Sequence, residues 1–561
     1  ETPARVRVTI LKEEGEPRWL PGMRVALFAE LGPPGAPVEP GGFDFRRIAW
    51  FDRLGAIGIA RGAVLRLEDG AAEGPWARAM IGVSALRATI TNGLRRALPG
   101  ETGGFAAAIL VGDQSGLPVA ARDALRASNL SHLLSISGLH MVLLTGFVYT
   151  VLRLALVLTL GVRAAWPVRK IAALAAMAAG LAYLALSGAA VPAQRSYIMV
   201  LVFFGAILID RAALSLRSVA LAAMAILVLM PESLMEVGFQ LSFAATIALV
   251  AAYDALARAG WNTGARGPFM QAAMMALTSL VAGSATAPFA AHAFHQSASY
   301  GLVANMLAVP LMGVWIMPAG VIAALLAPFG LEGLAVAAMG LGIDLVMAIA
   351  HWVAGFPGAL RRIAAPEAPV IVPIALGGLW LCLWRSRLRL AGIGAMLAGM
   401  AWWAGSVDRP DLIVAASGRQ IGLMGPTGRV ILDAKREGFA AREWLAADGD
   451  GVEPAEAALR EGLMRGRDWA SGRLGPWRIE IVTAREPDLA RLARLCGERV
   501  LLILPSFEAA PEGLCLAVTA GRLREAGALA FRLRGEALVA AEVLRPGPGR
   551  LWTAPGRGEA Q

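Results

Sequence analysis

The feature that most constrains this chain is a series of apolar stretches, each about 20 residues long with few charges, between Leu133 and Ala404. A helix of about 20 residues is long enough to cross the ~30 Å hydrocarbon core of a bilayer. The chain of 561 residues is 57% hydrophobic and 17% charged, whereas soluble domains are about 45–50% apolar and about 25% charged. We therefore predict a polytopic α-helical membrane protein with roughly 9–10 spans or re-entrant helices, which excludes a wholly soluble enzyme.

The segments on either side of this membrane domain, 129–405, differ from it in composition. In residues 1–72, "ARVRVTIL" and "MRVALFAEL" alternate apolar and polar side chains, which predicts a small, incomplete β domain. Residues 73–128 are amphipathic and rich in arginine, as expected of interfacial helices that lead into the membrane domain. Residues 406–561 contain short apolar runs such as "RVLLILP" between Gly/Pro turns, which predicts a soluble α/β tail. Because the first residue is Glu1 rather than Met, we expect the natural start to lie upstream.

Clusters of basic residues predict the orientation of the spans. The formal net charge is +10, and much of the excess lies in four clusters between spans. These are Arg163, Arg169 and Lys170; Arg211 and Arg217; Arg258 and Arg266; and Arg385, Arg387 and Arg389. If they face the cytoplasm, the β domain, the tail and the loops that carry polar motifs face the periplasm. Arg361 and Arg362 fit this count poorly, so we expect a broken or re-entrant span near 330–360.

The three cysteines lack the spacing of a zinc site. Cys382 lies in an apolar span and is expected to act as a small hydrophobe. Cys496 and Cys515 can form a disulfide if the tail faces an oxidising periplasm.

One polar motif stands out at the start of the membrane domain, "SNLSHLLSISGLHM". It places His132, Ser137, Gly138 and His140 where a polar side chain costs several kcal/mol on insertion scales. The groups can hydrogen-bond neighbouring helices, line a pathway, or form a Ser–His hydrolase pair. A serine and a histidine three residues apart on one helix seldom have nucleophile–base geometry, and no G-x-S-x-G motif follows, so catalysis is disfavoured.

Further polar residues follow in the loops predicted to face outward, and one lies upstream in a turn. They are Asp113 in "GDQSGL", Arg195 after "SGAAVP", Gln240 and Ser242 in "GFQLSF", His292 and His295 in "HAFH", and Asn305 before Pro310. Arg195 is either part of a pathway or an arginine that extends to the membrane surface. The histidine pair lacks a third ligand nearby, so we predict no metal there. Asn305 precedes a proline, as in the discontinuous helices that line transport pathways.

With these motifs in order, the chain resembles the ComEC-type competence proteins, the DNA uptake channels of natural transformation. The stretches that carry the resemblance are "GDQSGL" (112–117), "SHLLSISGLHM" (131–141), "SGAAVPAQRS" (187–196), "GFQLSFAA" (238–245) and "GLVANMLAVPL" (301–311). The upstream "LPGMRVALFAELGPPGAPVEPGGFDF" is similar to the end of the family's periplasmic OB-like domain. Five ordered motifs make the resemblance far more specific than any one of them alone.

The resemblance implies a multi-pass protein of the bacterial inner membrane that passes single-stranded DNA into the cytoplasm, with the β domain and tail in the periplasm. The residues implied as pathway candidates are Asp113, His132, Ser137, Gly138, His140, Arg195, Gln240, Ser242, His292, His295 and Asn305. The implied partners are single-stranded DNA and the lipid bilayer, with a periplasmic DNA receptor and a cytoplasmic DNA translocase as further candidates. No cofactor is expected. The alternative is a transporter or intramembrane hydrolase for another anionic polymer or lipid.

The resemblance also implies a C-terminal metallo-β-lactamase-like domain, proposed in the family to be a nuclease. Such a domain needs an H-x-H-x-D-H cluster, but all five histidines of this chain precede residue 352. We therefore expect a degenerate relic of that domain without nuclease activity, and a protein that is not an enzyme. The alternative for the tail is an unrelated soluble domain.

Overall fold

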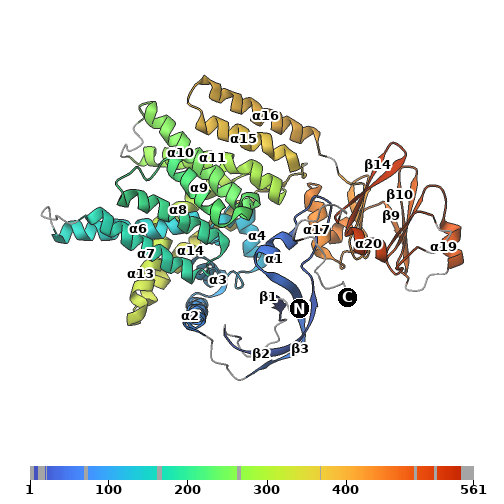
Figure 1. The fold of residues 1–561 in the computed structure, drawn as a ribbon, viewed down its shortest axis with the longest axis horizontal. Helices are drawn as coiled ribbons and strands as arrows, with labels where there is room; N and C mark the ends of the chain where they lie inside the picture. The colour runs from blue at the N-terminus through green and yellow to red at the C-terminus, as the bar shows by residue number, and fades with distance from the viewer. Residues whose placement is uncertain are drawn as a thin grey trace.

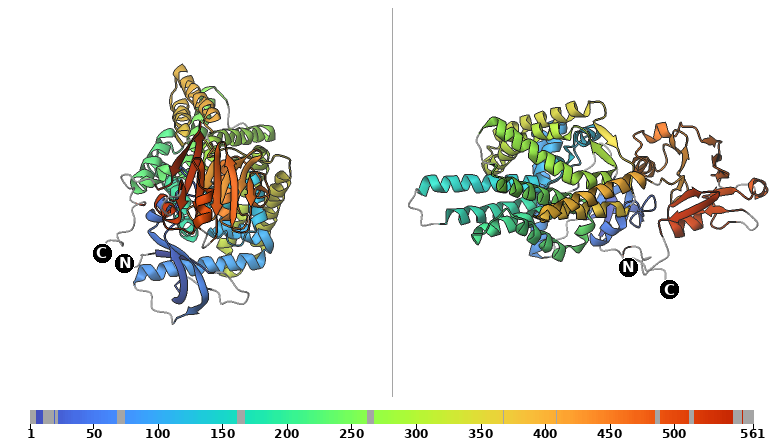
Figure 2. Two further views of the ribbon diagram at one scale, coloured as in Figure 1. Left: turned by 90° about the vertical axis from the view of Figure 1, so that its right-hand side faces the viewer. Right: turned by 90° about the horizontal axis from the view of Figure 1, so that it is seen from above.

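The computed structural model describes residues 5–10, 19, 22–67, 74–160, 167–261, 267–366, 368–407, 409–484, 489–510, 515–544 and 552. Figure 1 shows three parts: a helical bundle, a two-sheet tail at one end of the long axis, and a small sheet near the junction of the two. The end of the bundle nearer the tail is called the tail side below. Figure 2 shows the same arrangement from two further directions.

The N-terminal part is a three-stranded sheet of β1 (Arg5–Thr9), β2 (Val25–Gly32) and β3 (Leu54–Arg66), with α1 (Phe45–Phe51) before β3. The strand order is β1-β3-β2, with β1 parallel and β2 antiparallel to β3. These strands coincide with the alternating stretches of the sequence, which confirms a small β region.

The next segment contains α2 (Pro75–Ala97), α3 (Gly100–Val111), α4 (Val119–Ala127) and α5 (Ser131–Leu134). Figure 1 shows α2 nearly end-on while α6 and α7 run along the long axis, so α2 lies crosswise to the spans. It exposes Trp76, as an interfacial helix does. In contrast, α3 is not amphipathic, and Phe105 to Ile109 are completely buried. After its first three residues α3 has only apolar side chains and glycine, so every face packs against protein.

Seven helical segments within the described residues are long and apolar enough to cross a membrane. They are α6 (Gly138–Leu160), α7 (Val168–Leu186), α8 (Val191–Leu208), α10 (Val237–Arg258), α11 (Pro268–Phe294), the composite of α12 (Gly301–Pro310), η3 (Leu311–Ile316) and α13 (Met317–Leu326), and α14 (Gly333–Ala354). The shorter α9 (Leu216–Leu229), α15 (Ile371–Leu383) and α16 (Leu390–Gly405) pack beside them. A polytopic helical membrane protein is therefore confirmed.

The expectation of a break near 330–360 was wrong, because α14 is continuous from Gly333 to Ala354. Arg361 and Arg362 follow it in β5 (Leu360–Arg362), which pairs with β4 (Gln296–Ala298) on the tail side. The irregular span is the preceding one, where the π-helix η3 follows Pro310. A proline removes a helical hydrogen bond, which accounts for the local change of helix type.

The tail contains two five-stranded sheets, with strand orders β15-β14-β6-β7-β8 and β13-β12-β11-β10-β9. The strands are β6 (Leu412–Val414), β7 (Ile421–Gly425), β8 (Gly428–Ile431), β9 (Leu463–Arg465), β10 (Trp469–Leu474), β11 (Trp477–Val482), β12 (Val500–Leu504), β13 (Ala517–Thr519), β14 (Leu529–Arg534) and β15 (Ala537–Glu542). Their inner faces form one apolar core. Helices α17 (Gly438–Ala447) and α18 (Pro454–Ala457) cover one outer face, α19 (Leu489–Leu495) covers part of the other, and α20 (Ala520–Ala526) follows β13. The soluble α/β tail is therefore confirmed.

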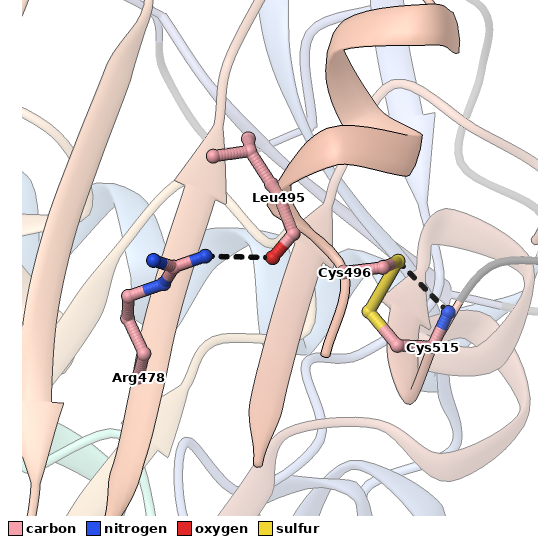
Figure 3. The surroundings of a disulfide bond; sticks show 4 residues. All are labelled: Arg478, Leu495, Cys496 and Cys515. Carbon is pink, nitrogen blue, oxygen red and sulfur yellow. Dashed lines mark hydrogen bonds between the residues drawn. A yellow bond between two sulfur atoms is a disulfide. The ribbon is translucent and has the colours of Figure 1, made fainter. Parts of the chain in front are cut away.

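The two cysteines of the tail form a disulfide. Cys496 and Cys515 have a Cα–Cα distance of 5.3 Å, and Figure 3 shows the bond beside the contact of Arg478 Nη2 with the Leu495 carbonyl, at 2.7 Å. Disulfides persist in oxidising compartments.

The tail contacts the other two parts through α17. The Trp444 indole Nε1 donates to the carbonyl of Val38, at 2.9 Å, and Val38 packs against the apolar cluster under α17. The backbone N–H of Ala365 donates to the carbonyl of Ala447 at 2.8 Å. The loop before α1 and the segment after β5 therefore both hold the tail against the tail side of the bundle.

Candidate functional site

The motif around His140 forms a break between two helices. Asn129 has a left-handed backbone conformation (φ 62°), α5 is a single turn, and α6 begins at Gly138. Ser and Asn side chains compete with helical hydrogen bonds, so such a stretch interrupts the helix instead of extending it. The polar side chains therefore gather at the tail-side end of α6.

Ser137 and His140 contact each other across the first turn of α6. His140 Nδ1 lies 3.4 Å from the backbone N of Ser137, and 3.2 Å from Ser137 Oγ. Because the backbone N–H can only donate, Nδ1 is the acceptor and the ring proton is on Nε2. His140 is fully buried, and its Nε2 has no hydrogen-bond partner among the described residues.

The Ser137–His140 contact differs from the expectation that residues three apart seldom meet in this way. The break before Gly138 lets Ser137 leave the helical path, so its hydroxyl can reach the ring. A triad also needs a third group that orients the base through its other nitrogen. No such group contacts His140 Nε2 in the part of the chain that the structure describes. The arrangement is a capping contact rather than a complete catalytic unit.

His132 is exposed, one turn before the break, and its Nδ1 lies 2.9 Å from the carbonyl of Asn129. Asn129 itself packs against the start of α12, where a Cβ on Gly301 would lie 2.7 Å from the Asn129 Cβ. Gly138 faces α8, and its nearest neighbour is Ser196 Oγ. The motif therefore contacts both α8 and α12, which are distant in the sequence.

Arg195 does not lie free at the mouth of a span. Its Nη1 forms an ion pair with Glu236 Oε2, at 2.5 Å, and its side chain is 6% exposed. The guanidinium lies directly over Gly238, where a Cβ would clash with it. A buried ion pair of this geometry is costly to break, because the remaining partner becomes an uncompensated charge. It ties the start of α8 to the start of α10.

Gln240 and Ser242 are partly buried in the first turns of α10. Gln240 Nε2 donates to the carbonyl of Leu234, at 3.2 Å, and so holds the short helix η2 (Pro231–Met235) against α10. Ser242 Oγ lies 4.0 Å from the sulfur of Met199 on α8.

Asp113 lies in the turn after α3. It accepts hydrogen bonds from the backbone N–H and the hydroxyl of Ser115, at 2.9 and 2.7 Å, and pairs with Arg95, at 3.3 Å. Burial raises the pKa of Asp113, but the Ser115 hydrogen bonds and the charges of Arg95 and Arg87 outweigh it and hold this pKa below its usual value. The turn is therefore fixed to α2 as an anion.

The remaining candidates lie at the connection from α11 to α12. His295 ends α11 in a left-handed conformation (φ 52°), and its carbonyl accepts from the N–H of Ile363. Burial, followed by the charges of His292 and Arg362, lowers the pKa of His295. Three buried side-chain atoms here have no hydrogen-bond partner among the described residues. They are His292 Nε2, His295 Nδ1 and Asn305 Oδ1.

The five motifs form one connected set of contacts. A Cβ on Gly112 would lie 2.9 Å from the carbonyl oxygen of Ser187 and 3.6 Å from Ile136, so the first three motifs meet at this turn. The Arg195–Glu236 pair joins the third motif to the fourth, and the Asn129–Gly301 contact reaches the fifth. Segments up to about 200 residues apart in sequence thus converge on the tail side.

Residues 109–388 match the family described as "Competence protein". The chain is also 26% identical over 307 residues to ComE operon protein 3 of Bacillus subtilis (strain 168). The chain is a ComEC-type competence protein. The alignment covers 54% of this chain but only 36% of that relative, so it spans little more than a third of the relative's length. No solved structure matches the chain.

All eleven candidate residues of this competence protein lie inside the matched region, whereas the N-terminal sheet and the tail lie outside it. The structure also brings out polar pairs that the sequence analysis missed. Glu101 contacts His351, at 3.1 Å, and Thr102 donates to Asp344 in the middle of α14. The sequence does point to Asp344, because it is the one acidic residue in the apolar stretch of α14 and an ionisable residue within a span is a candidate functional residue.

Proposed function

We propose that this competence protein takes up DNA and conducts a single strand of it across the inner membrane during natural transformation. The observation that carries the proposal is the convergence of five polar motifs on the tail side of the bundle. Polar groups inside a membrane domain are costly, so their concentration at one end supports a pathway for a polar substrate.

The helix termini favour an anionic substrate. The spans α6, α8, α10 and α12 all begin at the convergent motifs, at Gly138, Val191, Val237 and Gly301. A helix N-terminus carries about half a positive charge and unpaired N–H groups, and it attracts phosphate. Four such termini at one end would attract a polyanion, while the Arg195–Glu236 pair adds no net charge that would hold the strand in place. A channel needs this balance between attraction and release.

A transporter or an intramembrane hydrolase for another anionic polymer or lipid is the second candidate. Its support is the 3.2 Å contact between Ser137 Oγ and His140 Nδ1. Among the described residues, however, no group contacts His140 Nε2, so the pair lacks the third member that would orient a general base. The channel is therefore the better account of this motif.

For the tail we propose a metallo-β-lactamase-like relic that lies in the periplasm and does not act as the nuclease. Two packed sheets with helices on both outer faces support the fold, and the absence of histidine after residue 351 argues against its metal chemistry. The Cys496–Cys515 disulfide supports an oxidising location. Another protein would then cut the strand that is not transported. A periplasmic receptor would deliver DNA, and a cytoplasmic translocase would pull the strand.

The experiment is uptake of labelled DNA into the cytoplasm of a naturally competent host. Deletion of the gene should abolish uptake, and His132→Ala combined with His140→Ala should reduce it strongly while the protein still inserts. His351→Ala is a matched control, because it removes a histidine that lies outside the five motifs. Normal transformation without the gene would overturn the proposal. Full uptake by the double variant would remove the two histidines from the pathway.

A further inference from the structure

A hollow lined by arginine lies at the end of the bundle opposite the tail. The last turn of α10 meets the connection between α15 and α16 there, and the two line an open hollow of about 570 Å³. The polar side chains that line it come from Arg258, Arg385, Ser386, Arg387 and Arg389. We refer to these five residues as the arginine hollow. The two segments are more than 100 residues apart in sequence, so the fold, rather than the local sequence, brings their charges together.

The charge of the arginine hollow is mostly unbalanced. Arg258 pairs with Asp254, at 3.3 Å, within α10. Across the described part of the chain, no carboxylate pairs with Arg385, Arg387 or Arg389. Gathered guanidinium groups repel one another, so an anion bound between them would stabilise this arrangement. A guanidinium presents a planar fork of donors that fits a phosphate in a bidentate manner.

The backbone adds to the attraction for an anion. Helix α16 begins at Leu390, directly after the three arginines, and runs for 16 residues away from the hollow. Its N-terminal N–H groups and the positive end of its dipole therefore lie at the hollow. Ser386 caps the short helix η6 (Arg387–Arg389) by accepting from the N–H of Leu388, which holds the arginine loop in shape.

The surroundings of the hollow are those of a membrane interface. Trp380 and Trp384 stack with ring centroids 3.8 Å apart, and Trp380 Nε1 donates to the carbonyl of Leu388, at 2.9 Å. Tryptophan is enriched at the level of lipid headgroups. Leu388 and Leu390, beside the arginines, are 64% and 57% exposed. A mouth that releases a strand into water would not place leucines in this position, whereas lipid chains would cover them.

We propose that the arginine hollow binds the phosphate of an anionic phospholipid headgroup. The phosphate would bridge Arg258 on α10 to the arginines before α16 and so fasten the α15–α16 pair to the bundle. That pair leads directly into the tail, so the bound lipid would stabilise the attachment of the tail to the membrane domain. This inference does not depend on the proposed transport of DNA.

The test uses the purified full chain in detergent, titrated with dioleoylphosphatidylglycerol or dioleoylphosphatidylcholine, with bound lipid counted by native mass spectrometry. The wild-type protein should retain the anionic lipid selectively. Arg385→Gln combined with Arg387→Gln should weaken that binding by about 30-fold, which is ~2 kcal/mol at about 1 kcal/mol for each guanidinium–phosphate hydrogen bond lost. Arg385→Lys combined with Arg387→Lys keeps both positive charges but loses the bidentate guanidinium donors. This variant should therefore show a loss of lipid binding between those of the wild-type protein and the glutamine variant.

Arg211→Gln combined with Arg217→Gln is the matched control. Both arginines are exposed, Arg211 after α8 and Arg217 in the first turn of α9, and neither lines the hollow. It should change lipid retention by less than about twofold, because a change of that size is within ~0.4 kcal/mol. If the glutamine variants at Arg385/Arg387 and at Arg211/Arg217 lose the anionic lipid equally, the lipid responds only to general surface charge and the proposal is overturned. A parallel titration with a labelled oligothymidine provides the other arm. If the variant at Arg385 and Arg387 loses the oligonucleotide and keeps the lipid, the hollow is a contact for nucleic acid and the lipid proposal fails.

Discussion

The contact between the tail and the N-terminal β region should depend on pH through Glu39. This residue follows Val38, the acceptor of the Trp444 hydrogen bond. Burial raises the pKa of Glu39 from 4.5 to about 7, with Arg429 opposing and Asp448 and Glu443 adding to the increase. The docked state therefore binds a proton that the undocked state releases between about pH 4.5 and pH 7. Docking should weaken as the pH rises through this window.

The size of the effect follows from the two pKa values. A change from 4.5 to about 7 corresponds to about 3 kcal/mol between fully protonated and fully ionised Glu39. Glu39→Gln is neutral at every pH, so it should dock like the wild-type protein at pH 5 and more tightly at pH 8. The effect at pH 8 is an upper estimate, because partial opening would let water reach the carboxylate.

The assay is energy transfer between dyes on Gly35→Cys and Leu459→Cys, two exposed positions on either side of the contact, in a Cys382→Ser background. Urea is titrated at each pH from 5 to 8, and the midpoint of undocking is recorded. The wild-type midpoint should fall with rising pH, and the Glu39→Gln midpoint should fall much less. A wild-type midpoint that is constant or rises, or an equal slope in both proteins, would refute the reasoning.

Three further substitutions test other contacts. Glu236→Gln should lower the free energy of unfolding by about 3–5 kcal/mol, because it leaves the Arg195 charge buried without its partner. Thermal unfolding in detergent measures this loss. Arg195→Met combined with Glu236→Leu should recover most of the lost stability. Cys496→Ser removes a disulfide that joins positions 19 residues apart, and it should lower the free energy of unfolding of the tail in urea by about 3 kcal/mol. Reduction of the wild-type protein should have the same effect. No effect of either change would contradict the disulfide. Gly112→Ala should destabilise the protein by more than about 1 kcal/mol, because Gly112 has a φ of 76° and a Cβ there would press against the carbonyl oxygen of Ser187. The control Gly146→Ala, at a helical position with open space around it, should be neutral or stabilising.

The elements of the fold could be predicted wherever a local pattern decides burial. Val500 to Leu504 is a continuous apolar run between charged and proline residues, and all five residues are buried in β12. The long apolar helices likewise follow from the cost of leaving such stretches in water. Composition therefore sufficed for the membrane domain and for the layers of the tail.

The partners of the polar residues could not be predicted in this way. Arg195 and Glu236 are 41 positions apart, and only the packing of α8 against α10 shows that they meet. Similarly, Arg361 and Arg362 seemed to contradict the orientation of the spans, because nothing local indicates that β5 pairs with β4. The motifs located the candidate site, but its contacts depend on long-range pairing that periodicity does not encode.

The most direct test of the central claim is to cross-link a DNA strand during transport. A photoreactive amino acid is placed at His132 or Asn305 in the convergent motifs. Val228 on α9 and Leu334 on α14 are the control positions, since they lie outside the motifs and are 82% and 88% exposed. Competent cells that carry each variant take up labelled DNA and are then irradiated. The account predicts single-stranded DNA cross-linked at positions 132 and 305 and none at the two controls. Continued uptake with no cross-link at either motif position, or with equal cross-links at all four, would contradict it.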